Sequence, residues 1–146
     1  MTAKAHGARP PGIIIMTHGP LAEALITSAS MLYGELTDVV PLTLEMGESP
    51  ENYFRRLTEA LETVSGEPLF LLDFVGGTPF NTLVQHARNR DVFAISGVNI
   101  PMLLEAAHQR ESLSGSDLLG AVALAGHEGM VDLTEMIEEV KKGESE

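Results

Sequence analysis

Four short apolar runs, separated by longer segments with a helical pattern, constrain the fold of this chain most. The runs cover residues 13–16, 39–44, 69–72 and 92–95. They are continuous and not alternating, which is typical of strands buried on both faces of a parallel sheet. Strands that alternate with helices indicate right-handed crossovers, with helices on both faces. We therefore predict an α/β fold with a doubly wound, mainly parallel four-stranded sheet flanked by helices.

Proline, glycine and capping residues bound the helical segments between these runs. Pro20 opens the first helical pattern and Gly34 ends it, while Ser49 caps the second and Gly66 stops it. Further helices, the earliest of them capped by Thr78, are expected at about residues 78–89, 101–110 and 117–125. Each apolar run is followed by a helical segment, so each run and the helix after it form one β–α unit, and the helix at about residues 117–125 is additional.

The two ends of the chain differ from its centre. Residues 1–11 carry two prolines and are interpreted as a flexible leader, and residues 12–134 as one domain. Residues 130–133 are a candidate fifth strand, with helix as the alternative. The acidic tail, residues 135–146, is expected to be a solvated helix end or a frayed terminus.

Charge and residue usage exclude several classes of function. The formal net charge is −12, with 21 acidic residues against 9 Lys and Arg. Nucleic acid and anionic membrane surfaces need basic footprints, so neither is expected as the main partner. The chain has no cysteine, which excludes disulfides and thiolate chemistry. The apolar runs are too short to span a bilayer. No two histidines have the His-x-x-x-His spacing, so a metal site is not expected. We therefore expect a cytoplasmic protein without a cofactor.

Polar residues follow the first and third apolar runs, where each predicted strand ends. His18 comes after the first run, and Asp73 comes after the third. In the flavodoxin-like strand order these two strands are neighbours at the switch point, beyond whose carboxyl ends ligands bind. Each loop also leads into a helix N-terminus, which presents free N–H groups and a partial positive charge. The sequence therefore predicts that the imidazole faces the carboxylate at this edge.

Such a pair suits a phosphoryl acceptor. The carboxylate fixes the tautomer of the imidazole and stabilises the positive charge that develops on attack. Gly76 and Gly77 permit close backbone approach. N–H groups around Thr78 and Gly19, with the Thr78 hydroxyl, are candidate donors to phosphoryl oxygens. The chain has no P-loop lysine pattern, which favours a phosphorylated protein over ATP as the donor.

Each of these features also has a structural reading. A histidine after a strand is often structural, a Gly-Gly-Thr-Pro stretch is a turn and a helix cap, and a strand-terminal aspartate is common. Their convergence at one predicted switch point is what favours a site. Three classes of function stay open from the residues alone: a phosphoryl carrier, a regulatory module controlled by phosphorylation of His18, and a flavodoxin-like binder of small anions or nucleotides.

Three segments resemble the IIA family of the mannose, fructose and sorbose-type phosphoenolpyruvate-dependent sugar phosphotransferase systems. They occur in the family's order at residues 14–19, 72–81 and 96–103. The resemblance extends over about residues 12–134. Each motif alone is weak, but the three together are specific to this family.

The resemblance implies roles for particular residues and partners. His18 matches the phosphorylated histidine, Asp73 the carboxylate bonded to it, and Thr78 a hydroxyl near the phosphoryl group. Thr17 and Asn99 are candidate site-lining residues. The chain would be a protein-histidine phosphotransferase that accepts a phosphoryl group from the phosphocarrier protein HPr and passes it to a IIB component for sugar uptake. The family is homodimeric with an exchanged antiparallel C-terminal strand, for which residues 130–133 are the candidate.

Two departures from the family pattern qualify this expectation. Phe74 and Val75 stand where some relatives carry an aromatic residue beside the first glycine, so the contact with a partner is expected to differ. No IIB domain follows in this chain, so that partner is expected to be a separate protein. Without a IIB partner, the alternative is a regulatory phosphorelay module whose docking to a target protein depends on the phosphorylation state of His18.

Overall fold

The computed structural model describes residues 9–145, so residues 1–8 of the predicted leader and residue 146 of the tail lie outside the described part. Strands and helices alternate along the chain, as predicted. The elements, in order, are β1 (Ile13–His18), α1 (Leu21–Tyr33), β2 (Val39–Leu44), α2 (Pro50–Thr63), β3 (Leu69–Leu72), α3 (Gly77–His86), the 3₁₀ turn η1 (Ala87–Asn89), β4 (Phe93–Ile95), α4 (Ile100–Gln109), α5 (Gly115–Glu128) and α6 (Leu133–Ser145).

The four strands form one parallel sheet in the order β2-β1-β3-β4. This order confirms the prediction that the first and third strands are neighbours. The register of that pair ends with Met16 opposite Leu72, whereas β1 continues for two further residues beside β2. The carboxyl end of β1 therefore extends past the end of β3, and the residue that follows β3 lies alongside it.

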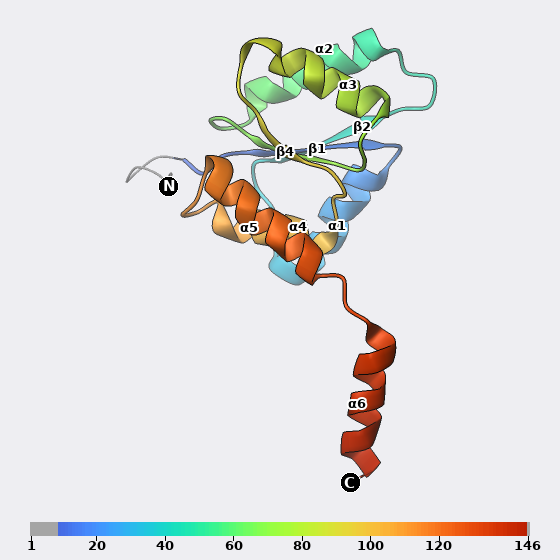
Figure 1. Cartoon of the computed structure of the whole chain (residues 1–146). Helices are drawn as coiled ribbons and strands as arrows, with labels where there is room; N and C mark the ends of the chain where they lie inside the picture. Colours follow the sequence, from blue (N-terminus) through green and yellow to red (C-terminus); the bar gives the residue numbers. More distant parts are fainter. Residues whose placement is uncertain (1–8, 146) are drawn as a thin grey trace.

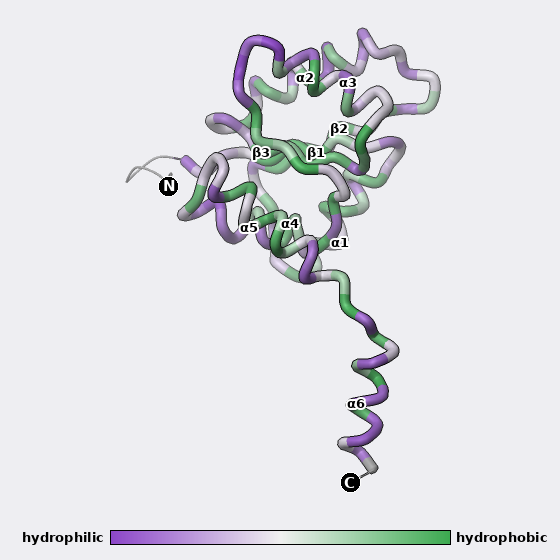
Figure 2. Tube along the Cα trace, in the orientation of Figure 1, coloured by the Kyte–Doolittle hydropathy of each residue, from purple (hydrophilic) through white to green (hydrophobic). Residues whose placement is uncertain are grey.

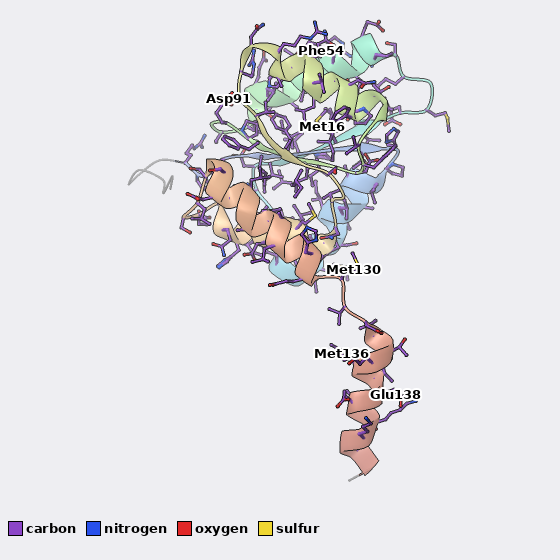
Figure 3. All side chains as sticks on the ribbon, in the orientation of Figure 1. Met16, Phe54, Asp91, Met130, Met136 and Glu138 are labelled. Atoms are coloured by element: carbon purple, nitrogen blue, oxygen red, sulfur yellow. The ribbon has the colours of Figure 1, made fainter. Side chains whose placement is uncertain are left out.

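Helices cover both faces of the sheet, as predicted (Figure 1). Helices α2 and α3 lie on one face, and α1, α4 and α5 lie on the other. Ile13 and Ile15 of β1 pack toward the second group, whereas Ile14 and Met16 pack toward the first, and all four are fully buried. Figure 2 shows the hydrophobic sheet between its two helical layers, and Figure 3 shows Met16 on the α2–α3 side. Both side-chain directions of the strand are buried, which explains why its apolar run is continuous.

Capping residues explain where two of the helices begin. The Ser49 hydroxyl accepts a hydrogen bond from the Asn52 N–H at 3.1 Å, so the predicted cap of α2 is confirmed. The predicted Thr78 cap of α3 is wrong, because Gly76 is the N-cap and Thr78 lies in the first turn. The φ angles of Gly76 and Gly77 are 108° and 78°. These two glycines turn the backbone into the helix earlier than a threonine would allow.

The C-terminal part departs most from expectation. Helix α5 extends to Glu128, beyond the predicted end near residue 125. Residues 130–132 form no strand within this single chain, and α6 begins at Leu133. A strand exchanged between two chains needs a second copy, so that expectation stays a prediction. In Figure 1, α6 projects away from the rest of the chain. Within residues 9–145, no helix is both long enough and apolar enough to cross a bilayer.

Replacing Tyr53 by Phe tests the contribution of a buried hydrogen bond to the core. Tyr53 is fully buried, and its hydroxyl donates to the Leu42 carbonyl at 2.7 Å. We expect Tyr53→Phe to lower the free energy of unfolding by about 1–2 kcal/mol, because that carbonyl loses a donor away from water. Urea unfolding followed by circular dichroism measures the change. Tyr33→Phe is the control, since that hydroxyl bonds Ala107 at 3.2 Å from a half-exposed ring. An equal loss in both variants would contradict this account.

Candidate functional site

His18 and Asp73 are in direct contact at the carboxyl edge of the sheet. His18 is the last residue of β1, and Asp73 directly follows β3. The Asp73 Oδ2 accepts the backbone N–H of His18 at 2.8 Å and lies 2.8 Å from His18 Nδ1. The side chains are 39% and 12% exposed, respectively. The predicted meeting of imidazole and carboxylate is thus confirmed as geometry, and the chemical roles of the two residues stay predictions.

Several backbone groups fix the Asp73 carboxylate and its peptide. Its Oδ1 accepts the N–H of Phe74 at 2.9 Å. Its own N–H donates to Met16, and its carbonyl accepts the N–H of Gly97. Burial raises the pKa of Asp73, but the hydrogen bonds from His18 and Phe74 outweigh burial, so the net pKa is lowered. Asp73 is therefore an ionised acceptor at neutral pH.

The ionised carboxylate decides which nitrogen of His18 is free. A carboxylate without a proton can only accept, so Nδ1 carries the hydrogen of their contact, and in the neutral form of the ring the lone pair lies on Nε2. Nε2 points to the start of α3, because a Cβ atom added at Gly77 would lie only 2.8 Å from it. Only glycine leaves space there. The free nitrogen of the neutral ring thus faces the first turn of a helix.

The start of α3 provides donors at this position. The first N–H groups of a helix have no partner within it and carry the positive end of the helix dipole. Gly77 and Thr78 are the first two residues of α3, so their N–H groups and the Thr78 hydroxyl belong to this turn. An anionic group on Nε2 would meet these donors. The structure therefore places Gly77 against His18, with Gly76 and Thr78 as its neighbours in the chain, and the phosphoryl-binding roles of the three residues stay predictions.

Gly19 and Thr17 have other local partners. The Gly19 N–H donates to the Leu44 carbonyl at 3.0 Å, so it is already engaged and is no free donor for an anion. Thr17 is fully buried, and its hydroxyl accepts the N–H of Ala22 at 2.9 Å. These bonds order the turn between β1 and α1 behind His18.

Asn99 belongs to a neighbouring loop and caps α4. Its Oδ1 accepts the Met102 N–H at 3.0 Å, and its Nδ2 donates to the Gly126 carbonyl. These partners direct the side chain to α4 and α5. The same loop still supports the site, because Val98 donates to the Leu72 carbonyl at 3.0 Å. Asn99 is thus the N-cap of α4, and its predicted site-lining role stays a prediction.

The remaining histidines have structural or surface positions within the described residues. His86 ends α3 and lies against Phe70, with ring centroids 5.8 Å apart. Burial and nearby Arg90 lower its pKa. His108 and His127 are exposed, and His6 lies outside the described residues. Within residues 9–145, no group of three His, Cys, Asp or Glu side chains is placed to hold a metal ion.

Phe74 was not predicted to be part of this site. Its ring lies against the imidazole of His18, with ring centroids 5.1 Å apart and planes tilted by 34°. The sequence signal was an aromatic residue directly after the aspartate, which was interpreted only as a partner contact. Sequence position alone does not tell whether such a ring turns outward or onto the histidine.

The fold and the site together define a class of protein. It is a parallel α/β domain whose switch point holds a partly exposed histidine, paired with an ionised carboxylate and facing a helix N-terminus. Residues 12–123 match the family described as PTS system fructose IIA component, where PTS denotes phosphotransferase system. The chain belongs to this family and is a IIA component of the mannose, fructose and sorbose type.

Curated relatives and solved structures agree with this assignment. The chain is 32% identical to the fructose-specific EIIA component of Bacillus subtilis, over 88% of this chain and 90% of that protein. It is 37% identical to the mannose-specific EIIAB component of Escherichia coli, over 81% of this chain but 38% of that longer protein. The crystal structure of an EIIA component from Streptococcus agalactiae has a TM-score of 0.76 and 30% identity, covering 85% of this chain and 98% of that one.

Asp73→Asn tests the ionised carboxylate through the pH dependence of stability. A carboxylate whose pKa is lowered by folding stabilises the native state above its unfolded pKa, and this contribution is lost as the pH falls through the folded pKa. We therefore expect the free energy of unfolding to decrease below about pH 4. This acid-induced decrease should be smaller in Asp73→Asn, as measured by urea unfolding between about pH 7 and pH 3.

The exposed Asp91 provides a matched control, because Asp91→Asn makes the same chemical change outside the site. That variant should keep the acid-induced decrease of the wild type. An unchanged decrease in Asp73→Asn would contradict the stabilising role of the ionised carboxylate.

Proposed function

We propose that this chain is a phosphoryl carrier that accepts a phosphoryl group on Nε2 of His18 and passes it to another protein. The observation that carries this proposal is the orientation of His18. Asp73 occupies Nδ1 at 2.8 Å, while Nε2 faces the start of α3. One nitrogen is thereby fixed by a carboxylate, and the other is free beside donors suited to an anion.

The transfer step follows from this arrangement. The Nε2 lone pair of neutral His18 forms a bond to phosphorus, the donor's nitrogen–phosphorus bond breaks, and its electron pair returns to the donor imidazole. The hydrogen on Nδ1 stays in place, so the His18 ring becomes positively charged. The Asp73 carboxylate compensates this charge, and the first turn of α3 binds the phosphoryl oxygens. Transfer to an acceptor histidine is the same step with the roles exchanged.

The family and the composition support the identity of the partners. We propose phosphorylated HPr as the donor and a IIB component as the acceptor, which places the protein in the cytoplasm on the path of sugar uptake. The chain has no P-loop lysine pattern, which supports a protein donor over ATP. The Escherichia coli relative is named as an EIIAB component, which supports a IIB component as the acceptor.

His18→Gln tests the phosphoryl carrier directly. With HPr, its phosphorylating enzyme and phosphoenolpyruvate, we expect the wild type to gain one acid-labile phosphoryl group, measured as an 80 Da increase (roughly the mass of one phosphoryl group) by intact mass spectrometry. The variant should gain none, because the accepting nitrogen is absent.

The exposed histidines His108 and His127 provide controls, since their Gln variants should still be phosphorylated. An adduct that persists in His18→Gln would end the assignment of His18. A wild type that accepts nothing from phosphorylated HPr would contradict the proposed donor.

We also propose that the protein is a homodimer in which the C-terminal segment contacts the second copy. The apolar side chains of α6 lie at helical spacing and are each 49–61% exposed: Leu133, Met136, Ile137 and Val140. Figure 3 shows Met136 and Glu138 on a helix that has no other helix or strand of the described residues beside it. An isolated helix of 13 residues is only marginally stable in water. The exposed apolar stripe is therefore expected to pack against a partner surface.

The double substitution Ile137→Glu and Val140→Glu tests this dimer. We expect the wild type to have the mass of two chains by light scattering, and the variant to have the mass of one with reduced helix content, because the apolar stripe is interrupted. Thr134→Glu is the control, as it adds a charge to an exposed residue outside the stripe. A monomeric wild type would contradict the proposal.

A further inference from the structure

The Phe74 ring lies at the surface, where an apolar side chain contributes little to the stability of the hydrophobic core. It is 54% exposed, at the tip of the turn between β3 and α3. Its ring nevertheless contacts His18, with centroids 5.1 Å apart. Its backbone is held in place, because the Phe74 N–H donates to Asp73 Oδ1 at 2.9 Å. The same carboxylate that orients the imidazole thus also positions the aromatic residue against it.

Three residues surround the imidazole ring of His18 on different sides. Asp73 lies at the Nδ1 edge, Gly77 lies at the Nε2 edge, and Phe74 lies against the ring itself. A Cβ atom added at Gly76 would be 3.9 Å from Phe74 Cε2, which is an ordinary van der Waals distance, so the Phe74 ring also lies close to Gly76. The His18 side chain is 39% exposed, and the exposed surface is the part of the ring that these three residues do not cover.

We propose that Phe74 is a positioning residue, which holds the His18 ring with Nε2 toward α3 and shields the nitrogen–phosphorus bond from water. Only the shielding of the nitrogen–phosphorus bond rests on the proposed function, whereas the positioning of the ring does not. The phosphorylated ring is cationic, and an aromatic ring within about 6 Å of a cation stabilises it. A covered ring also has fewer directions from which water can approach phosphorus.

The reaction that Phe74 slows is hydrolysis of the carrier. A water oxygen bonds to phosphorus, the nitrogen–phosphorus bond breaks, and its electron pair returns to Nε2. The products are neutral His18, with the hydrogen still on Nδ1, and dihydrogen phosphate. A phosphorylated carrier loses its phosphoryl group by this hydrolysis before it meets its acceptor. An aromatic ring that covers the histidine therefore preserves the phosphoryl group until transfer.

The first experiment measures this loss on the isolated phosphoprotein. Wild type, Phe74→Ala, Phe74→Leu and Phe74→Trp are phosphorylated, separated from the donor and followed by intact mass spectrometry at neutral pH. We expect Phe74→Ala to lose its phosphoryl group ~2–5-fold faster than the wild type, Phe74→Trp to behave as the wild type, and Phe74→Leu to lie between them. Because leucine keeps an apolar side chain without an aromatic ring, a shorter lifetime in Phe74→Leu than in Phe74→Trp assigns the protection to the aromatic ring.

Val75→Ala is the matched control, since Val75 is the neighbouring residue and is 64% exposed. It should keep the wild-type lifetime. Equal lifetimes of wild type and Phe74→Ala would overturn the shielding role. A wild type that accepts no phosphoryl group contradicts the proposed function, and the second experiment then decides the inference about Phe74 without it.

The second experiment needs no phosphoryl group. Diethyl pyrocarbonate acylates the free nitrogen of neutral histidine, and peptide mass mapping gives the rate at His18. We expect acylation of His18 to be ~2–5-fold faster in Phe74→Ala, with unchanged rates at the exposed His108 and His127. An unchanged rate at His18 would overturn the positioning role, and equal gains at all three histidines would overturn it as well, because the effect would then not be specific to the His18 ring.

Discussion

The contact between Asp73 and His18 is the interaction on which the rest of the site depends. One carboxylate oxygen binds both the backbone N–H and the Nδ1 of His18, each at 2.8 Å. The two residues are 55 positions apart and meet because β1 pairs with β3 and extends beyond it. Without this contact, neither the tautomer nor the direction of the ring would be fixed, and the helix N-terminus would face no particular atom.

Local dipoles make the proposed binding of an anionic group compatible with the acidity of the chain. The net charge is −12, and no lysine or arginine lies between Leu72 and Asn81, the loop and first turn that follow β3. The N–H groups at the start of α3 provide the positive potential instead, and Gly77 lets them approach Nε2 closely. The uncharged donors act at short range, so the overall acidity of the chain does not prevent phosphoryl binding at this point.

The sequence predicted well what depends on neighbours along the chain. The second and third apolar runs are strands with the expected bounds, and Ser49 caps α2. Predictions failed where one local signal competed with another. Thr78 is a good cap residue, but the two glycines before it start α3 sooner. Residues 130–132 form no strand among the described residues of the single chain, and the exchange of residues 130–133 between two chains stays a prediction.

The class of fold, the pairing of His18 with Asp73 and the glycine-rich turn beside them could be predicted from the sequence, because apolar periodicity and strand order follow from local patterns and general topology. Which donors are free and which rings are in contact became known only from the folded structure. The Gly19 N–H is engaged by Leu44, and Phe74 turns onto His18. Such details depend on register and on side-chain direction between distant segments, and a linear pattern specifies neither.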